Sequence, residues 1–287
     1  MLVIIPLWLP HYPGGLDLNV IKALKKISAP TIDRVLKHTR KKYKRVNPST
    51  TKPGTLLRNQ IPIKTNQWDE FRPGFLEADT VAHCGGSTAG QYVNTATGWT
   101  EQRAVWGKGE TDVLAQIKDV ENSLPFELLG FDSDNGGEFL NYHLLRHFAD
   151  HRKTPIQFTR SRAYKKDDNA HIEQKNYTHV RQKLGYKRFE NQKMVDLLND
   201  LYKNEWRLYH NFFLPSVKLI EKERIRSKII KKHDKPKTPY QRVLDSDSMD
   251  VPNSIKQKLT HQLEHLNPFA LKKIIDNKIN KILKLAS

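Results

Sequence analysis

The order of strand-like and helix-like segments restricts the fold of this chain more than any other feature. Three β-like segments come close together: GFLEADTVAHC, YVNTATGW and TEQRAVWGK. An amphipathic helical segment, ETDVLAQIKDVENSL, follows, and two more strand-like segments then alternate with helices. Strands joined by short turns pair antiparallel, whereas parallel strands need crossovers that are usually helical. The sequence therefore predicts an α/β fold whose mixed sheet begins antiparallel and continues parallel.

Helical segments flank this region on both sides. Before it, two short apolar repeats separated by Ser28-Ala29-Pro30 predict two helices, which fit the end of a helix-turn-helix region. A stretch rich in Pro, Ser and Thr then indicates an extended linker. We expect five segments: a helical region at 1–46, a linker at 47–70, a core at 71–190, a helical basic continuation of the core at 191–245, and C-terminal helices at 246–287.

The charge of the chain points to a polyanionic partner. There are 49 Lys and Arg residues against 31 Asp and Glu residues, which gives a net charge of +18. This excess is larger than solubility requires. The basic residues cluster at 37–45 and at 224–237, which favours nucleic acid binding over scattered surface lysines. In the first cluster, Arg40, Lys41 and Lys42 are candidate DNA contacts.

Cysteine content and hydropathy bear on the compartment. Cys84 is the single cysteine in the sequence, which excludes an intramolecular disulfide framework and fits a reducing compartment. The apolar start MLVIIPLWLP lacks a basic n-region and is too short to span a bilayer, and no other stretch approaches that length. We expect a cytoplasmic, nucleoid-associated protein with no membrane partner.

Three acidic residues occupy positions in strands and in a helix whose neighbouring positions are apolar. Asp79 lies inside the first apolar strand, and Asp134 ends another apolar strand where a Gly136-Gly137 turn leads into a helix. Glu173 falls in the middle of the apolar stripe of a helix predicted to begin at Asn169. A carboxylate that points at the sheet is costly unless it is paired or bound to metal. A salt bridge to a sheet residue would also satisfy Glu173, so that alternative stays open.

Acids from two strands and a facing helix can meet at one point. They would repel each other strongly unless a multivalent cation lay between them, and oxygen-only ligands select Mg²⁺ or Mn²⁺. A calcium loop starting at Asp132 does not fit, because its fifth and twelfth positions are Gly136 and His143. Two ions about 3.5–4 Å apart can activate a water or hydroxyl and stabilise the leaving oxygen of a phosphodiester. That chemistry suits a protein that binds nucleic acid.

The three acidic motifs together resemble those of a known enzyme family. Asp79 in EADTV, Asp134 in SDNGGEF and Glu173 in KKDDNAHIEQKN look like the D, D and E of insertion-sequence transposases with a retroviral-integrase-like catalytic core; 54 and 38 residues separate them. The likeness covers roughly residues 71–244. It implies an RNase H-like fold, with a five-stranded mixed sheet flanked by helices, and two Mg²⁺ (or Mn²⁺) ions held by this triad.

The resemblance also implies an activity and partners. DDE-type transposases are polynucleotidyl transferases that nick DNA and transfer the ends of a mobile element to target DNA. The implied partners are therefore DNA, both element ends and target, and further copies of the chain in a homo-oligomer on DNA. Four residues beside the acids would hold phosphates on this view: Lys165, Lys166, Lys175 and Asn176. Plain solvation would explain each of these four equally well.

The family pattern distinguishes between neighbouring acids and also reveals two departures. It makes Asp134 the ligand and Asp132 a flanking residue. Asp167 and Glu138 are expected to be solvated, because helix caps and first turns favour acids.

The first departure from the family pattern is a second strand that is expected to be shortened, because GQYVNTATGW runs almost directly into the TGW turn. The second is that the chain begins near the end of the helix-turn-helix region that relatives carry before the core. Both departures favour an alternative function, a truncated and catalytically impaired remnant that binds DNA without joining it.

Overall fold

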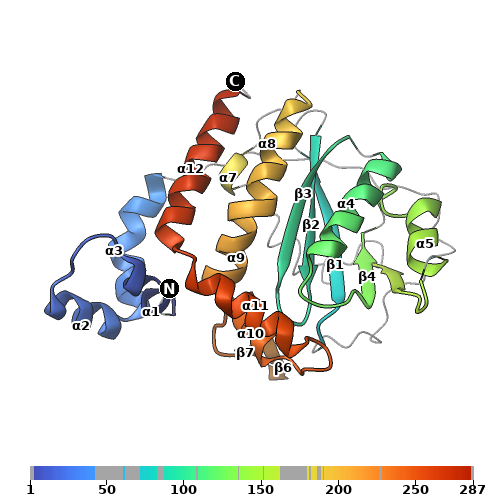
Figure 1. Cartoon of the computed structure of the whole chain (residues 1–287). Coiled ribbons are helices and arrows are strands. Elements are labelled where there is room, and N and C mark those ends of the chain that lie inside the picture. Colours follow the sequence, from blue (N-terminus) through green and yellow to red (C-terminus); the bar gives the residue numbers. More distant parts are fainter. Residues whose placement is uncertain are drawn as a thin grey trace.

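The structure is a computed structural model of the whole chain (Figure 1). It describes residues 3–42, 61, 72–82, 87–107, 109–134, 136–150, 152–161, 180, 182–185, 189, 191–225 and 228–285. Three helices open the chain: α1 (Ile4–Trp8), α2 (Leu18–Lys26) and α3 (Ala29–Lys42). Asp17 caps α2, because its side chain accepts a hydrogen bond of 2.7 Å from the Asn19 N–H. In the described part of the chain, every helix lacks the combination of length and hydropathy that a membrane span requires.

A five-stranded mixed sheet forms the centre of the molecule. Its strands are β1 (Phe75–Ala82), β2 (Ser87–Asn94), β3 (Thr100–Trp106), β4 (Gly130–Ser133) and β5 (Gln157–Arg160). Their order across the sheet is β3-β2-β1-β4-β5. The first three strands pair antiparallel, and β4 and β5 add in parallel. This topology confirms the predicted α/β fold with an antiparallel start and parallel additions.

The second strand is not shortened, so that expectation was wrong. β2 has eight residues, as many as β1, and it pairs with β1 from Leu76↔Asn94 to Ala82↔Thr88. The three residues that follow it, 95–97, form the turn before Gly98, whose φ of 73° suits glycine. The strand therefore begins earlier in the sequence than the YVNTATGW segment suggested, and the sheet has no gap beside β1.

Helices α4 (Glu110–Ser123) and α5 (Tyr142–Ala149) pack beside the sheet, α4 through buried aliphatic residues and α5 through aromatic contacts with β4 and β5. Phe131 of β4 is completely buried, and its ring centroid lies 5.0 Å from that of Phe148 on α5. The ring centroid of Phe158 on β5 lies 6.0 Å from that of Phe131, and the two rings stand edge to face. Burial of each such ring contributes roughly 1.5–3 kcal/mol. This cluster holds β4 in place, and β4 carries the sequence that ends in Asp134.

Two asparagine side chains form hydrogen bonds with the backbone at the outer edge of β3. Helix α8 (Lys193–Leu201), a π-helical turn at Tyr202–Trp206 and helix α9 (Arg207–Phe213) run alongside this strand (Figure 1). Asn211 accepts a hydrogen bond from the Thr100 N–H and donates one to the Thr100 carbonyl, both at 2.9 Å. Asn199 makes the same pair of bonds with Ala104, at 2.8 and 2.9 Å. The two asparagines thus cover an edge that would otherwise offer unpaired backbone groups.

A buried arginine links β3 to α4. Arg103, 2% exposed, forms an ion pair of 3.2 Å with Glu101 and a hydrogen bond with Asp119 on α4. Arg207 of α9 also pairs with Glu101. Burial raises the pKa of Asp119, but the hydrogen bonds and charges of Arg103 and Lys203 outweigh that effect and hold this pKa below its usual range.

The C-terminal part contains a hairpin that the sequence did not reveal. The hairpin consists of β6 (Leu219–Ile225) and β7 (Lys228–His233), and it lies within the segment 191–245 that we expected to be helical. After it come α10 (Pro239–Asp245), α11 (Asn253–Glu264) and α12 (Pro268–Leu285), and the last two lie where C-terminal helices were expected. Four apolar residues of α12 are buried where this helix packs along α8 and α9: Leu271, Ile275, Ile279 and Ile282.

Candidate active site

The parallel pairing of β1 with β4 brings Asp79 and Asp134 together. The parallel register of the two strands ends with Ala78 of β1 opposite Ser133 of β4. Asp79 follows Ala78 within β1, and Asp134 follows Ser133 directly after the end of β4. Neighbouring strands lie about 4.8 Å apart, and residues opposite each other in a parallel pair point to the same face. Both side chains are partly exposed. Two carboxylates that are 54 residues apart in sequence therefore occupy adjacent positions at one end of the sheet.

Short backbone contacts orient each of these carboxylates. Asp79 Oδ1 accepts a hydrogen bond of 2.8 Å from the Thr80 N–H. Asp134 Oδ1 accepts one of 3.0 Å from the Gly136 N–H, two residues further along the chain. An Asp that bonds the N–H two residues ahead forms a local turn. This turn explains why a short polar residue followed by glycines ends β4.

Glu138 is a third acid of this site, and the expectation that it is solvated was wrong. Its side chain is only 6% exposed, and its Oε1 accepts a hydrogen bond of 2.6 Å from the Thr80 hydroxyl on β1. A Cβ added to Gly136 would lie 2.7 Å from Glu138 Oε2 and 2.9 Å from Asp134 Oδ1. The two carboxylates therefore converge on the same glycine. A side chain at this position would make both carboxylates shift.

Asp132 lies deeper on the same face of β4 as Asp134. It is completely buried, and its Oδ1 accepts a hydrogen bond of 2.6 Å from the Thr159 hydroxyl of β5. Across the sheet it stands opposite Glu77 of β1, which is 2% exposed. Asp132, which flanks Asp134 in the sequence, is therefore buried inside the sheet, two residues before the partly exposed Asp134.

The residue types at this place suit a hard divalent cation, although the ligand oxygens of Asp79, Asp134 and Glu138 are not all within 4.8 Å of one another in this structure. Asp79 within β1 and Asp134 directly after β4 offer carboxylate oxygens only, and Glu138 in the turn that follows adds a further carboxylate beside them. Oxygen-only ligands of this kind suit Mg²⁺ or Mn²⁺ and disfavour metals that prefer sulfur or imidazole. A bound cation would also reduce the repulsion between neighbouring carboxylates.

Several of the expected site residues cannot be placed relative to this cluster. Glu173, the third member of the expected triad, lies outside the described residues. The same holds for four expected phosphate contacts: Lys165, Lys166, Lys175 and Asn176. Arg40, Lys41 and Lys42 belong to the last turns of α3, where the structure describes the backbone but not these side chains.

The role of Glu138 could have been read from one local signal. It follows Asp134 by four residues, and two glycines lie between them in the sequence SDNGGEF. Such a turn can return the chain toward the residue that precedes it. The acidic first turn expected of the next helix suggested solvation instead, but that helix starts only at Tyr142 and is capped by Asn141.

Solved structures similar to this chain come from retroviral integrases. The HTLV-2 integrase catalytic core domain, in complex with magnesium, matches with a TM-score of 0.38 and 14% identity over 51% of this chain and 92% of that one. The simian T-cell lymphotropic virus intasome, in complex with a PP2A regulatory subunit, matches with a TM-score of 0.42 and 12% identity over 79% and 66% of the two chains. The BIV integrase catalytic core matches with a TM-score of 0.36 and 14% identity over 60% and 94%.

Sequence comparison identifies a relative without a known function. No family model matches the chain. The uncharacterized protein y4rM of Sinorhizobium fredii is 36% identical over 250 residues, which cover 83% of this chain and 70% of the relative. This identity extends over most of both sequences. The chain therefore belongs to the same protein family as y4rM.

Proposed function

We propose that this protein is a DDE-type transposase that nicks DNA and transfers the ends of a mobile element to target DNA. The observation that carries the proposal is the parallel register of β1 and β4, which brings Asp79 inside β1 next to Asp134 directly after β4. Glu173 would complete the triad from the segment after β5, as the resemblance to insertion-sequence transposases implies. The sheet order and the acidic motifs support the same assignment independently of each other.

In this proposal the acids hold two Mg²⁺ or Mn²⁺ ions. Such a pair of ions activates a water or DNA hydroxyl and stabilises the leaving oxygen of the phosphodiester. Asp79 within β1 and Asp134 directly after β4 serve as ligands. The Thr80 hydroxyl orients Glu138 so that its other carboxylate oxygen lies close to Gly136 and Asp134. Glu138 thereby supplies further negative charge beside the metal ligands.

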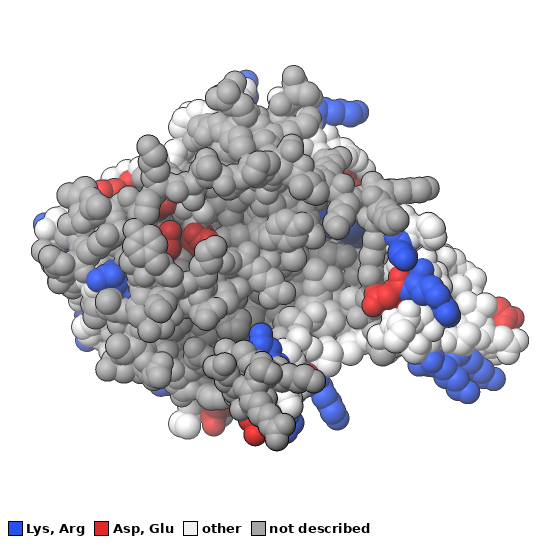
Figure 2. Space-filling model, turned by 180° about the vertical axis from the view of Figure 1, so that it is seen from behind, with Lys and Arg blue, Asp and Glu red and all other residues white. Residues whose placement is uncertain are grey.

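Basic surface elements would bind the DNA that the metal site acts on. Lys and Arg side chains occur at separate places on one face of the molecule, including a group over the N-terminal helices at the right of Figure 2. The β6–β7 hairpin adds exposed Lys231 and Lys232 on a two-stranded ribbon. A ribbon of this kind can enter the major groove of DNA. We assign Arg40, Lys41 and Lys42 and the four residues beside the triad to the same role, and we expect a homo-oligomer because two DNA ends must be joined.

The alternative function is a remnant that binds DNA without joining it. One of its two grounds was a shortened second strand, and β2 is as long as β1. A cooperative thermal transition that rises with Mn²⁺ would argue against the remnant, because a ligand stabilises only a site that is formed.

An activity assay tests the proposal. Wild type, Asp79→Asn, Asp134→Asn and Glu173→Gln would be compared for nicking and joining of supercoiled plasmid in Mn²⁺, with DNA affinity measured in parallel. Asp112→Asn, an exposed acid at the start of α4, is the matched control. We expect the three site variants to lose at least about 100-fold in product formation while still binding DNA, because metal ligands are removed. Site variants as active as wild type would refute the proposal. Inactive wild type with DNA binding retained would favour the remnant.

A further inference from the structure

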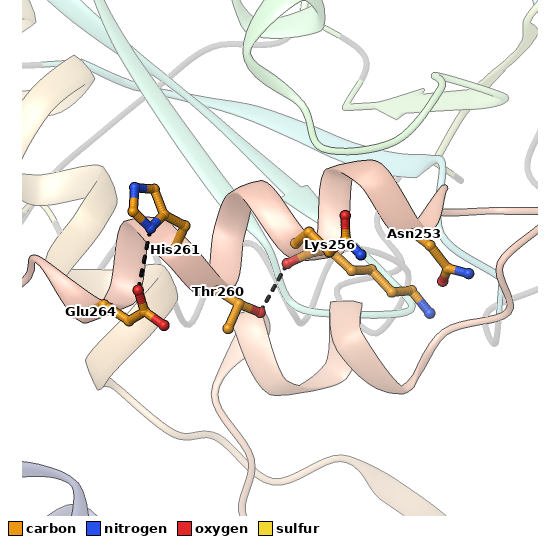
Figure 3. Close-up of a pocket in the computed structure, with 6 residues that line it drawn as sticks. Asn253, Lys256, Thr260, His261 and Glu264 are labelled. Atoms are coloured by element: carbon orange, nitrogen blue, oxygen red, sulfur yellow. Dashed lines mark hydrogen bonds and ion pairs between the residues drawn. The ribbon is translucent and has the colours of Figure 1, made fainter.

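The last turn of α11 carries a cluster of metal-ligating side chains far from the acidic site in sequence. His261, Glu264 and His265 each offer one ligand atom, and these atoms all lie within 4.8 Å of one another. All three residues are exposed. Figure 3 shows the His261 ring and the Glu264 carboxylate of α11 turned toward one another, and both residues line a pocket together with Asn253, Lys256 and Thr260. Residues spaced by three and four positions share one face of a helix, which explains why this sequence, HQLEH, brings the three together.

The cluster is already close to a chelating arrangement. His261 Nδ1 and Glu264 Oε2 are 3.2 Å apart, and the two imidazole rings stand edge to face with centroids separated by 4.7 Å. Two histidines at positions i and i+4 of a helix are a recurrent pair of zinc ligands, because one helical turn places both on the same face. A shift of side-chain torsions alone would direct all three ligand atoms to one ion.

The backbone beneath the cluster is fixed on both sides. At the end of α11, the His265 N–H donates to the Gln262 carbonyl at 3.2 Å. Two residues later, the Asn267 side chain caps α12 by accepting from the Phe269 N–H at 2.9 Å. Leu259, on the opposite side of α11, is buried. Ligands held on a rigid helix lose little freedom when they bind a metal ion, which favours affinity.

Two electrostatic features favour a cation at this position. The cluster lies at the C-terminal end of a twelve-residue helix, where the partial negative charge of the helix dipole attracts cations. Glu264 adds a formal negative charge, whereas the protein as a whole carries +18.

We propose that His261, Glu264 and His265 form a surface site for Zn²⁺, separate from the carboxylate site at the strand ends. Two imidazoles and one carboxylate are a common zinc donor set, and a fourth tetrahedral position remains open to water. The ligand types also separate the two sites: imidazole favours Zn²⁺, while the carboxylates of β1 and β4 favour Mg²⁺. Zinc at this position would tie the last turn of α11 together beside the junction with α12.

Zinc binding to the full chain tests this proposal. Metal-free protein would be titrated with Zn²⁺ by calorimetry in excess Mg²⁺, and Co²⁺ would be added separately as a spectroscopic probe of tetrahedral nitrogen and oxygen ligation. The test variant is His261→Ala with His265→Ala. The matched control is His143→Ala with His233→Ala, two exposed histidines elsewhere. Circular dichroism would show that both variants are folded.

We expect wild type and the control to bind one Zn²⁺ that the test variant does not bind, and Glu264→Gln to weaken this binding by about tenfold or more. Zinc affinity should also fall at acidic pH, because protons compete for the imidazoles. The same zinc site should persist in Asp134→Asn, so the result does not depend on the proposed DNA chemistry. Equal zinc stoichiometry in wild type and the test variant, or no bound zinc in wild type, would overturn the proposal.

Discussion

Replacement of Asn211 by alanine should destabilise the protein strongly, because this side chain satisfies the edge of the sheet. Asn211 is completely buried, and its amide makes two hydrogen bonds of 2.9 Å to the backbone N–H and carbonyl of Thr100, a residue that is 3% exposed. In Asn211→Ala both backbone groups would remain buried without these bonds. A buried polar group that loses its partner costs about 1–3 kcal/mol. Two such groups give an expected loss of about 2–6 kcal/mol in the free energy of unfolding.

Urea denaturation followed by circular dichroism measures this loss. The matched control is Asn204→Ala, because Asn204 is exposed and its amide donates to Asp200, one turn earlier in the chain, and not to the sheet edge. We expect the control to change the free energy of unfolding by less than about 0.5 kcal/mol, as surface substitutions usually do. The thermal midpoint of Asn211→Ala should fall in parallel, by about 2–4 °C for each kcal/mol. An Asn211→Ala variant as stable as the Asn204→Ala control would refute the reasoning about the sheet edge.

Three further predictions follow from the site, from the buried arginine and from the hairpin. Gly136→Ala should lower Mg²⁺ affinity, measured by calorimetry, and plasmid nicking by about tenfold or more, because the new Cβ would displace two carboxylates. Gly137→Ala is the control: its Cβ would meet nothing within 4 Å, so both quantities should stay unchanged. The lowered pKa of Asp119 contributes stability that is fully present above its unfolded pKa of 3.8. This stability is lost as the pH falls through the lower pKa of the folded state. In urea titrations, Asp119→Asn should therefore lose less stability than wild type on acidification below about pH 4. Replacement of Lys231 and Lys232 by alanine should weaken binding to DNA of any sequence. It should also reduce by about 1.8 the magnitude of the slope of log affinity against log salt concentration. An unchanged slope in a binding titration would exclude the hairpin from the DNA-binding surface.

The parts of the fold that follow from local periodicity could be predicted from the sequence. Helix α4 and helix α12 have regular apolar stripes, and the structure has both where the stripes indicated. The pairing of Asp79 with Asp134 was also predictable, because each acid interrupts or ends an apolar strand. Their adjacency itself depends on the strand register, which is a tertiary property that no local pattern contains.

The hairpin, the start of β2 and the burial of Glu138 could not be read in the same way. The β6 sequence LIEKERI mixes charged and apolar residues on an exposed ribbon, so it lacks the alternation that marks a half-buried strand. The early part of β2, STAG, contains small residues with weak strand preference, and its pairing with β1 determines its conformation. Glu138 was misjudged because its burial depends on a hydrogen bond with Thr80, which is 58 residues away.

Anomalous diffraction from crystals grown with Mn²⁺ would test the central claim most directly. We expect a strong anomalous peak between the carboxylates of Asp79 and Asp134, with Glu138 beside it, and the loss of this peak in Asp134→Asn. A wild-type structure in which Mn²⁺ is absent from these strand ends, or an Asp134→Asn structure that keeps the peak, would contradict the assignment of a metal-dependent active site at this end of the sheet.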